Sequence, residues 1–309
     1  MARSTRISLP YARTGDLVRE LGEVSGVLGI SVERGGAVMP QGDVLIIEST
    51  TRALPDILGV LHQRGVLSDP QASVTTSEPQ SAVSVTATDP LRDDVSDNSF
   101  EEMEYTLGKE SNMTVNGVLL MAASGAIAAF GLLTDALHLV VAGAIIAPGF
   151  EPLSRIGLGL VGQNRRTVRR GLVHSLRAYL ALIAAAALAA LVIRVVGGPI
   201  AGTAYLASNA LSAYWSKVTW LSSVNALVAG LAGALLIATG RSILTAGVMT
   251  ALGLIPSAAL VGIALAYLDA SLAGEAFSRL LLEAILVALS SVAVFGWKRA
   301  QIHRRPLAR

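Results

Sequence analysis

The feature that most constrains the fold of this chain is a series of long apolar segments after residue 113. Residues 114–297 are nearly continuous apolar runs, whereas residues 1–113 carry most of the acidic side chains. A helix that crosses a hydrocarbon core of ~30 Å needs ~20 apolar residues, and this region offers about six runs of that length. The expected spans are 114–133, 136–161, 172–196, 220–239, 242–267 and 276–297. The sequence therefore predicts a polytopic α-helical membrane protein.

The composition narrows the class of function. Hydrophobic residues make up 52% of the 309 residues and charged residues only 15%, which is more apolar than ordinary soluble domains. There is no cysteine, so disulfides and thiolate metal sites are excluded, and the four histidines show no metal-ligand spacing. Because no nucleophile–base pair is recognisable, we expect no enzyme activity, no metal and no cofactor. The net charge of +2 gives no reason to expect a nucleic-acid partner.

Positive charges next to the spans predict the orientation in the membrane. Cations concentrate in cytoplasmic loops, and here they cluster after the second span and in a basic tail over 298–309. The loop after the second span is expected to contain Arg165, Arg166, Arg169 and Arg170. We therefore expect a multi-pass protein of the cytoplasmic (inner) membrane, with both termini and the N-terminal domain in the cytoplasm.

Residues 1–85 are predicted to form a small α+β domain. Strand and amphipathic-helix patterns follow one another in the order β-α-β-β-α-β, which is typical of ferredoxin-like domains. No Gly-rich phosphate loop or acidic cluster marks a ligand site, so a folding or assembly role is expected here. Residues 86–113 are expected to form a polar linker and then a short amphipathic helix along the membrane surface.

Two features favour a homo-oligomer. The fourth span is rich in small residues that allow close helix packing, within one chain or between chains; they include Ala229, Gly230, Ala232, Gly233 and Ala234. An exposed sheet edge in the N-terminal domain would offer a second pairing surface. The expected partners are thus the lipid bilayer, a second copy of the chain, and a small solute or ion.

The membrane region is predicted to consist of two halves of three spans. One constant shift along the sequence places Leu119 on Leu227, Gly125 on Gly233, Val140 on Val248 and Pro148 on Pro256. Three spans per half is an odd number, so the two halves would be inserted in opposite senses. Inverted repeats with proline-interrupted helices at matching positions indicate a transporter whose site lies near the bilayer midplane.

The second span contains helix breakers and opposite charges in an otherwise apolar segment. Pro148 and Pro152 lack an N–H and Gly149 lowers helix propensity, so we expect a break there. The freed carbonyls must then face protein or water. Glu151 and Arg155 are costly in lipid, so they should face the bundle interior or a cavity. They are also four residues apart, so an ion pair between them is an alternative.

Further candidate residues lie in the other spans. We expect a second break at Pro256, with the Ser257 hydroxyl as a neutral ligand. Glu283, in the sixth span, is expected to lack a basic neighbour at helical spacing and to mark a proton or cation path. Asn225 and Asn116 are expected to serve either as interhelical hydrogen-bond partners or as substrate ligands.

The glycines Gly157, Gly159 and Gly162 satisfy the pattern GxGxxG of dinucleotide-binding proteins. That pattern requires a preceding strand in a βαβ unit. Here it lies inside a predicted membrane span, where small residues permit close helix packing. It therefore predicts no nucleotide site.

Two of these segments resemble the domain-of-unknown-function 389 family of hydrophobic prokaryotic membrane proteins. They are GAIIAPGFEPLSRIGLGL in the second span and TALGLIPSAALVGIAL in the fifth. Pro148 and Pro152 match the family's paired prolines in the second span, whereas in the fifth only Pro256 is kept and Ser257 replaces the second proline. Glu151 and Glu283 also depart from the family pattern. The resemblance implies a prokaryotic membrane protein and, over the membrane region and more loosely the N-terminal domain, a shared fold, but it implies no substrate.

Two functions from different classes follow. The first is a secondary transporter or channel-like permease for an ion or small solute, with its site between the break at 148–152 and Pro256. Glu151 and Glu283 would bind a proton, a cation or a cationic group. The alternative is a membrane-anchored sensor or scaffold whose cytoplasmic domain binds a ligand or partner.

Overall fold

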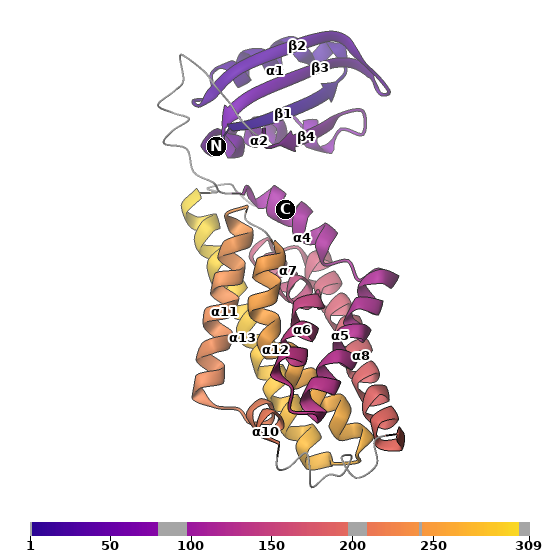
Figure 1. Ribbon diagram of the computed structural model, residues 1–309. Helices are drawn as coiled ribbons and strands as arrows, with labels where there is room; N and C mark the ends of the chain where they lie inside the picture. Colours follow the sequence, from indigo (N-terminus) through magenta and orange to yellow (C-terminus); the bar gives the residue numbers. More distant parts are fainter. Residues whose placement is uncertain (1, 80–97, 197–208, 241–242, 303–309) are drawn as a thin grey trace. The chain divides into compact units, whose positions relative to one another are not determined.

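The computed structural model describes residues 2–79, 98–196, 209–240 and 243–302. Within the chain, contacts gather in two compact units, one up to Ser99 and one from Phe100 to Gln301. Figure 1 shows the strands and helices of each unit, which are described separately below. Most of the polar linker expected at the start of 86–113 lies outside the described residues, as does most of the basic tail.

The N-terminal unit is a four-stranded antiparallel sheet with two α-helices. Its strands are β1 (Ala2–Leu9), β2 (Val27–Val38), β3 (Gln41–Thr50) and β4 (Ser73–Ser77), and its helices are α1 (Tyr11–Gly22) and α2 (Leu54–Gln63), with short 3-10 helices at Thr51–Ala53 and Val66–Ser68. The strand order is β2-β3-β1-β4. The element order is the predicted β-α-β-β-α-β.

Alternation along the strands builds the core of this unit. Successive side chains of a strand point to opposite faces, and Ile7 of β1 lies beside its pairing partner Leu45 of β3 in the buried cluster. The apolar stripe of α1, with Leu17 and Leu21, packs into the same cluster. Leu61 of α2 completes it. The helices therefore cover one face of the sheet through residues at helical spacing.

Asp43, at the start of β3, is a buried carboxylate that organises the irregular part of β2. Its side chain accepts a hydrogen bond of 2.9 Å from the backbone N–H of Gly35 and lies 3.4 Å from Arg34 Nη1. The pairing of β2 with β3 shifts register between Glu33 and Ala37, so Asp43 supports the bulged segment. The Gly35 N–H lowers the pKa of Asp43, and burial opposes this while Arg34 adds to it.

This lowered pKa predicts that the N-terminal sheet weakens in acid. A carboxylate whose folded pKa is depressed stabilises the fold above its unfolded pKa of about 3.8 and loses that contribution as the pH falls further. Hydrogen exchange of the full-length chain, corrected for intrinsic rates at each pH, should show falling protection of β2 and β3 below about pH 4. Asp43→Asn should flatten this dependence. An unchanged pH profile in the variant would contradict the assignment.

The second unit is helical. Its helices are α4 (Phe100–Glu110), α5 (Val115–Leu133), α6 (Leu137–Ile146), α7 (Phe150–Val161), α8 (Arg165–Val196), α10 (Ala210–Ser216), α11 (Trp220–Ala238), α12 (Ile243–Ala266) and α13 (Ala270–Ile302). Four of them, α5, α8, α11 and α13, are long and apolar enough to cross a membrane. The pair α6 and α7 forms a fifth candidate span with a bend of 49°. This arrangement is consistent with a multi-pass membrane protein.

The structure departs from the predicted spans in three places. Among the described residues there are four to five candidate spans, so the expected six are not confirmed; the apolar part of α12 described with side chains, Leu252–Ala266, is the remaining shorter helix. The arginines expected in a loop lie in the first two turns of α8, which begins at Arg165 rather than 172. The short helix α10 was not expected, because seven residues carry too little periodicity to predict one.

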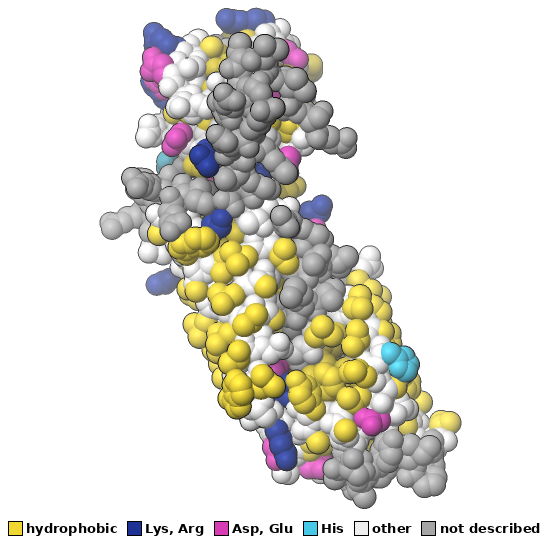
Figure 2. All heavy atoms as spheres, turned by 60° about the vertical axis from the view of Figure 1, so that its left-hand side comes forward, with side chains coloured by type: hydrophobic (Ala, Val, Ile, Leu, Met, Phe, Trp, Pro, Cys, Tyr) yellow, Lys and Arg dark blue, Asp and Glu magenta, His cyan; other side chains and the backbone are white. Residues whose placement is uncertain are grey.

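The outer surface of the helical unit supports its assignment to a membrane. Figure 2 shows hydrophobic side chains predominating on the visible face of this unit. Large apolar side chains are exposed along the long helices, among them Leu176, Leu188, Val228, Leu281 and Leu289. A soluble monomer rarely exposes apolar patches of this extent.

Small residues allow the helices to approach closely, as the sequence predicts for the GxGxxG segment. A Cβ atom at Gly157 would lie 2.7 Å from Ser291 Cβ on α13, and one at Gly159 would lie 2.7 Å from the backbone N of Val168 on α8. These glycines lie on α7 in a helical bundle, with no strand before them. They are packing residues, and their helical context differs from the strand-and-helix unit that the dinucleotide pattern requires.

The juxtamembrane helix α4 packs onto the bundle. Its Met103 and Leu107 are fully buried in the apolar core of the helical unit. Glu104 accepts hydrogen bonds from Asn164 Nδ2 (3.1 Å) and Thr167 Oγ1 (2.9 Å) at the start of α8. The apolar face of this amphipathic helix is therefore covered by protein, which the pattern alone did not distinguish from contact with lipid.

Candidate functional site at a broken helix

The predicted break in the second span is confirmed. Helix α6 ends at Ile146, helix α7 begins at Phe150, and their axes differ by 49°. Pro148 lies in the interval, where the backbone N–H of Gly149 donates to the carbonyl of Ala147 at 2.9 Å. Proline cannot donate to the preceding turn and clashes with it, so the helix ends here and restarts in a new direction.

Side chains of neighbouring helices donate hydrogen bonds to backbone carbonyls at the break. The hydroxyl of Ser124 on α5 donates to the Gly143 carbonyl in the last turn of α6, at 2.7 Å. The hydroxyl of Tyr179 on α8 donates to the Gly149 carbonyl at 3.2 Å. A Cβ atom at Gly149 would lie 3.1 Å from that hydroxyl, so a larger residue would push Tyr179 away. Protein side chains therefore form hydrogen bonds with carbonyls at the break, as an interrupted helix within a membrane requires.

Pro152 plays a different part from the one predicted. It is the third residue of α7, in the first turn of that helix. The first four N–H groups of a helix have no intrahelical acceptor, so a proline at this position removes no hydrogen bond. The interruption therefore lies at Pro148 and Gly149, and Pro152 favours the restart by its fixed φ.

The predicted break at Pro256 is wrong. Helix α12 runs without interruption from Ile243 to Ala266 with Pro256 inside it. The next residue, Ser257, is buried, and its hydroxyl donates to the Gly253 carbonyl at 3.2 Å. One proline within a well-packed helix is accommodated by local adjustment, whereas the first half combines proline with glycine at the interruption. The two matched prolines thus differ in structure.

Glu151 lies in the first turn of α7, directly after the break. Its side chain is 6% exposed, and its Oε2 atom has no hydrogen-bond partner among the described residues. The amino end of a helix presents unpaired N–H groups and a positive dipole end, which favour a carboxylate. Helix α7 therefore stabilises the charged form of Glu151 in part, yet one carboxylate oxygen has no hydrogen-bond donor among the described residues.

The alternative ion pair of Glu151 with Arg155 is absent from the described part of the chain. Arg155 Nη1 instead donates to Ser111 Oγ at 2.9 Å, to Asn112 Oδ1 at 3.1 Å and to the Gly108 carbonyl at 3.4 Å. These groups belong to the end of α4 and the turn after it. Arg155 consequently anchors that turn to α7. Its hydrogen bonds thus join α7 to the end of α4, and no ion pair or hydrogen bond between Arg155 and Glu151 is formed among the described residues.

Glu283 has a basic neighbour, contrary to the prediction. Arg279, one turn earlier on α13, donates from Nε to Glu283 Oε1 at 2.9 Å. Both side chains are 3% exposed. The spacing of four residues in SRLLLEAIL is the ordinary sequence signal for such a pair.

Arg279 is held from several sides. Its Nη1 donates to the carbonyls of Tyr214 in α10 and, at 3.3 Å, of Lys217 directly after that helix. Its guanidinium also lies 5.1 Å from the centre of the Tyr214 ring. The guanidinium is thus fixed in place, and Glu283 is positioned with it.

Glu283 is one of the residues that line a small cavity. The cavity measures about 10 Å³ and is bordered by α11, α12 and α13, with Asn225, Gly253 and Glu283 among its lining residues. Glu283 Oε2 has no hydrogen-bond partner in the described structure. A Cβ atom at Gly253 would lie 3.4 Å from that oxygen. A space of this size holds about one water molecule or one small ion.

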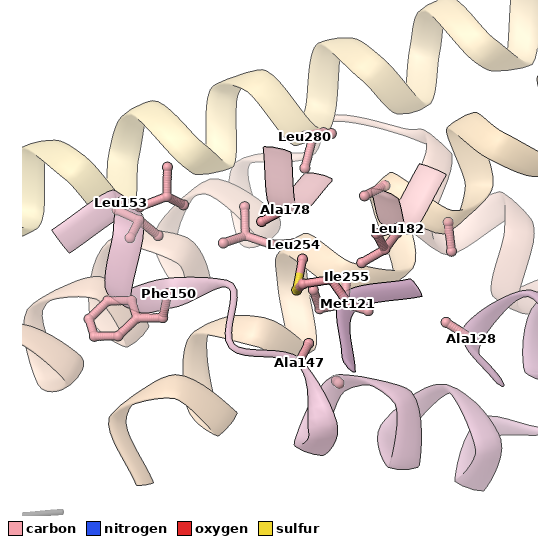
Figure 3. Close-up of a cluster of buried hydrophobic side chains, with 14 of the residues drawn as sticks. Met121, Ala128, Ala147, Phe150, Leu153, Ala178, Leu182, Leu254, Ile255 and Leu280 are labelled. Carbon is pink, nitrogen blue, oxygen red and sulfur yellow. The ribbon is translucent and has the colours of Figure 1, made fainter. Parts of the chain in front are cut away.

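The structure brings some of the predicted site residues together and separates others. Asn225 and Glu283 share the cavity, and Gly253, one helical turn before Ser257, lines it too. Figure 3 shows Ala147 and Phe150, on either side of the break, among buried apolar side chains of a cluster that also contains Ile255. Asn116, exposed in the first turn of α5, is not among the residues that line the cavity.

The arrangement therefore presents two buried carboxylates, Glu151 and Glu283, each with one unmet oxygen. Tyr179 donates to the Gly149 carbonyl, a role at the break that could not be predicted because it depends on how α8 packs against α6 and α7. No group of three or more metal-ligating side chains occurs within the described ranges.

Comparison with known proteins relates this chain to one family. The model of the family "Domain of unknown function (DUF389)" matches residues 144–289, from the end of α6 into α13. The resemblance predicted from the two proline-containing segments is thus shown, but the match leaves out the first span and the N-terminal unit. No curated protein and no solved structure matches.

Proposed function

We propose that this chain, which resembles the DUF389 family, is a secondary transporter or channel-like permease for an ion or small solute. The observation that carries the proposal is the pair of buried carboxylates, Glu151 beside the broken helix and Glu283 at a cavity. Each has an oxygen without a hydrogen-bond partner among the described residues. Acids of this kind inside membrane segments generally mark proton or cation paths.

Energetics favour a ligand-binding role over a purely structural one. Burying a polar atom without a hydrogen bond costs roughly 1–3 kcal/mol, and most buried polar side-chain atoms in folded proteins have a partner. If Glu283 served only to stabilise the fold, the hydrogen bond from Arg279 would be enough for one oxygen, and a second donor for the other oxygen would increase stability. Because it lines a small cavity instead, Glu283 is suited to hold a proton or a singly charged cation.

The membrane architecture is part of the proposal. We infer six spans built as two inverted repeats of three, with α6 and α7 together corresponding to α12. In support, α5 and α11 have 19 residues each, while α8 and α13 have 32 and 33. The shift that places Pro148 on Pro256 also places Leu182 on Ser290, and each of these is closely approached by a glycine of the first helix of its half.

The orientation and assembly follow from the same reasoning. By the positive-inside rule, the arginines at the start of α8 favour a cytoplasmic position for that end, and we propose the same side of a prokaryotic membrane for both termini and the N-terminal unit. Small residues at helix contacts and the sheet edges of the N-terminal unit favour a homo-oligomer. In this scheme the N-terminal unit gates or assembles the complex.

Flux measurements with the protein reconstituted into liposomes test the function. Protons, Na⁺, K⁺ and small solutes should be screened, and one of them should cross at a rate well above empty liposomes. Glu151→Gln and Glu283→Gln keep the side-chain shape but remove the charge, so the flux should fall at least about tenfold in each, equivalent to ~1.4 kcal/mol on the barrier. Glu275→Gln, on the exposed start of α13, is the matched control and should transport normally.

The outcomes separate the candidate functions. Undiminished flux in both buried-acid variants would remove Glu151 and Glu283 from the mechanism. Failure to move any solute would overturn the transport proposal in favour of the sensor or scaffold.

A further inference from the structure

We propose that a cleft between α7 and the start of α8 binds the phosphate group of an anionic membrane phospholipid. The cleft has a volume of about 360 Å³. Arg165 and Arg169 of α8 line it, together with the apolar side chains of Leu160, Val168 and Leu172. Nothing in the proposed transport path involves these residues.

The charges in the cleft are available for a ligand. Arg165 and Arg169 are exposed and stand one helical turn apart, and no acidic partner is recorded for either within the described ranges. Glu104 of α4 accepts hydrogen bonds from Asn164 and Thr167 at this end of α8 instead. Two guanidinium groups on one helix face present paired N–H donors, from which phosphate oxygens can accept hydrogen bonds.

The helix face continues from these arginines into an apolar stripe. Leu172, Leu176 and Leu180 follow at the spacing of one helix face and are 55%, 62% and 55% exposed. The same face of α8 thus changes from cationic to apolar along its length. A phospholipid has that order of groups, with a phosphate above acyl chains, whereas free phosphate or a soluble anion would make no use of the leucines.

The position in the bundle fits a lipid headgroup. The cleft lies where α7 ends, at Val161, and α8 begins, at Arg165, so it is at an end of two membrane helices. Leu160 on the α7 side is 53% exposed and provides the opposite apolar wall. Basic pockets between membrane helices at the cytoplasmic side are recognised sites for anionic headgroups.

The chain contains its own control for this proposal. Arg166 and Arg170 belong to the same two turns of α8 and are exposed, but they do not line the cleft. Arg165→Gln with Arg169→Gln, and Arg166→Gln with Arg170→Gln, therefore remove equal charge from the same helix. Only the first pair removes it from the cleft.

Native mass spectrometry of the full-length protein in detergent gives the test, with dioleoyl phosphatidylglycerol and dioleoyl phosphatidylcholine as probes. We expect phosphatidylglycerol to be retained at least about fivefold more than phosphatidylcholine. The cleft variant should lose this preference and the control variant should keep it, while both retain the melting temperature of the wild type. Inorganic phosphate at millimolar concentration should not displace the lipid.

Three results would overturn the proposal. Equal loss of preference in both double variants would show attraction to general surface charge, and an undiminished preference in the cleft variant would exclude the site. Displacement of the lipid by inorganic phosphate would assign the cleft to a soluble anion. These results are independent of flux, so they do not depend on the transport proposal.

Discussion

Glu283→Ala is expected to destabilise the helical unit by about 3–5 kcal/mol, because it leaves the guanidinium of Arg279 buried without its counter-ion. The remaining partners of Arg279, the carbonyls of Tyr214 and Lys217, carry no charge to balance it. Unfolding of the purified protein in detergent, followed by circular dichroism with a mild denaturant, measures the change in free energy. A strongly lowered transition is the expected result.

The double variant Arg279→Met with Glu283→Leu separates the ion pair from simple packing. Replacing a buried pair by apolar side chains of similar size is often neutral or stabilising. Most of the stability lost in Glu283→Ala should therefore return, although flux should not. A double variant as unstable as Glu283→Ala would show that the acid acts through its other contacts rather than by neutralising Arg279.

Gly125→Val is expected to cost about 3 kcal/mol or more, because it forces α5 away from α8. A Cβ atom at Gly125 would lie only 2.3 Å from the backbone oxygen of Leu182, and a backbone atom cannot rotate aside as a side chain does. The contact lies in the fully buried core, beside Leu182 and Ala128. The same unfolding measurement in detergent reports the loss.

Gly274→Ala is the control for this prediction. Nothing lies within 4 Å of a Cβ atom at Gly274, in the first turns of α13, and alanine is the better helix former by up to about 1 kcal/mol. The control should therefore be neutral or slightly stabilising. If Gly125→Val were tolerated equally well, the close α5–α8 crossing would not be the arrangement in solution.

The break at Pro148 was predictable because its causes are local. A proline followed by a glycine interrupts the hydrogen-bond ladder whatever surrounds it. The outcome at Pro256 was not predictable, since a single proline leads to a kink, a break or neither according to how neighbouring helices pack. In this chain one proline lies inside the continuous helix α12, whereas another lies at the break between α6 and α7.

The composition of the site could be predicted only in part. Glu151 and Glu283 stood out because acids are rare in apolar runs. Their surroundings depend on tertiary packing: Tyr179 comes from α8, and Arg155 turns toward the end of α4 instead of its neighbour on α7. Arg279 is the exception, since its spacing to Glu283 was visible in the sequence.

Accessibility of the cavity to water is the most direct test of the central claim, that an aqueous path reaches Glu283. The chain has no cysteine, so a cysteine introduced by Ala226→Cys is the only target for a charged, membrane-impermeant thiol reagent. Ala226 lines the cavity and is only 8% exposed. Val228→Cys, on the same helix, is the control: Val228 is 57% exposed on the outer surface but does not line the cavity. The reagent needs water to form a reactive thiolate. We expect rapid modification at position 226 in liposomes, slowed by the transported ion, and none at 228. An unreactive cysteine at 226, or equal reaction at both positions, would contradict the account.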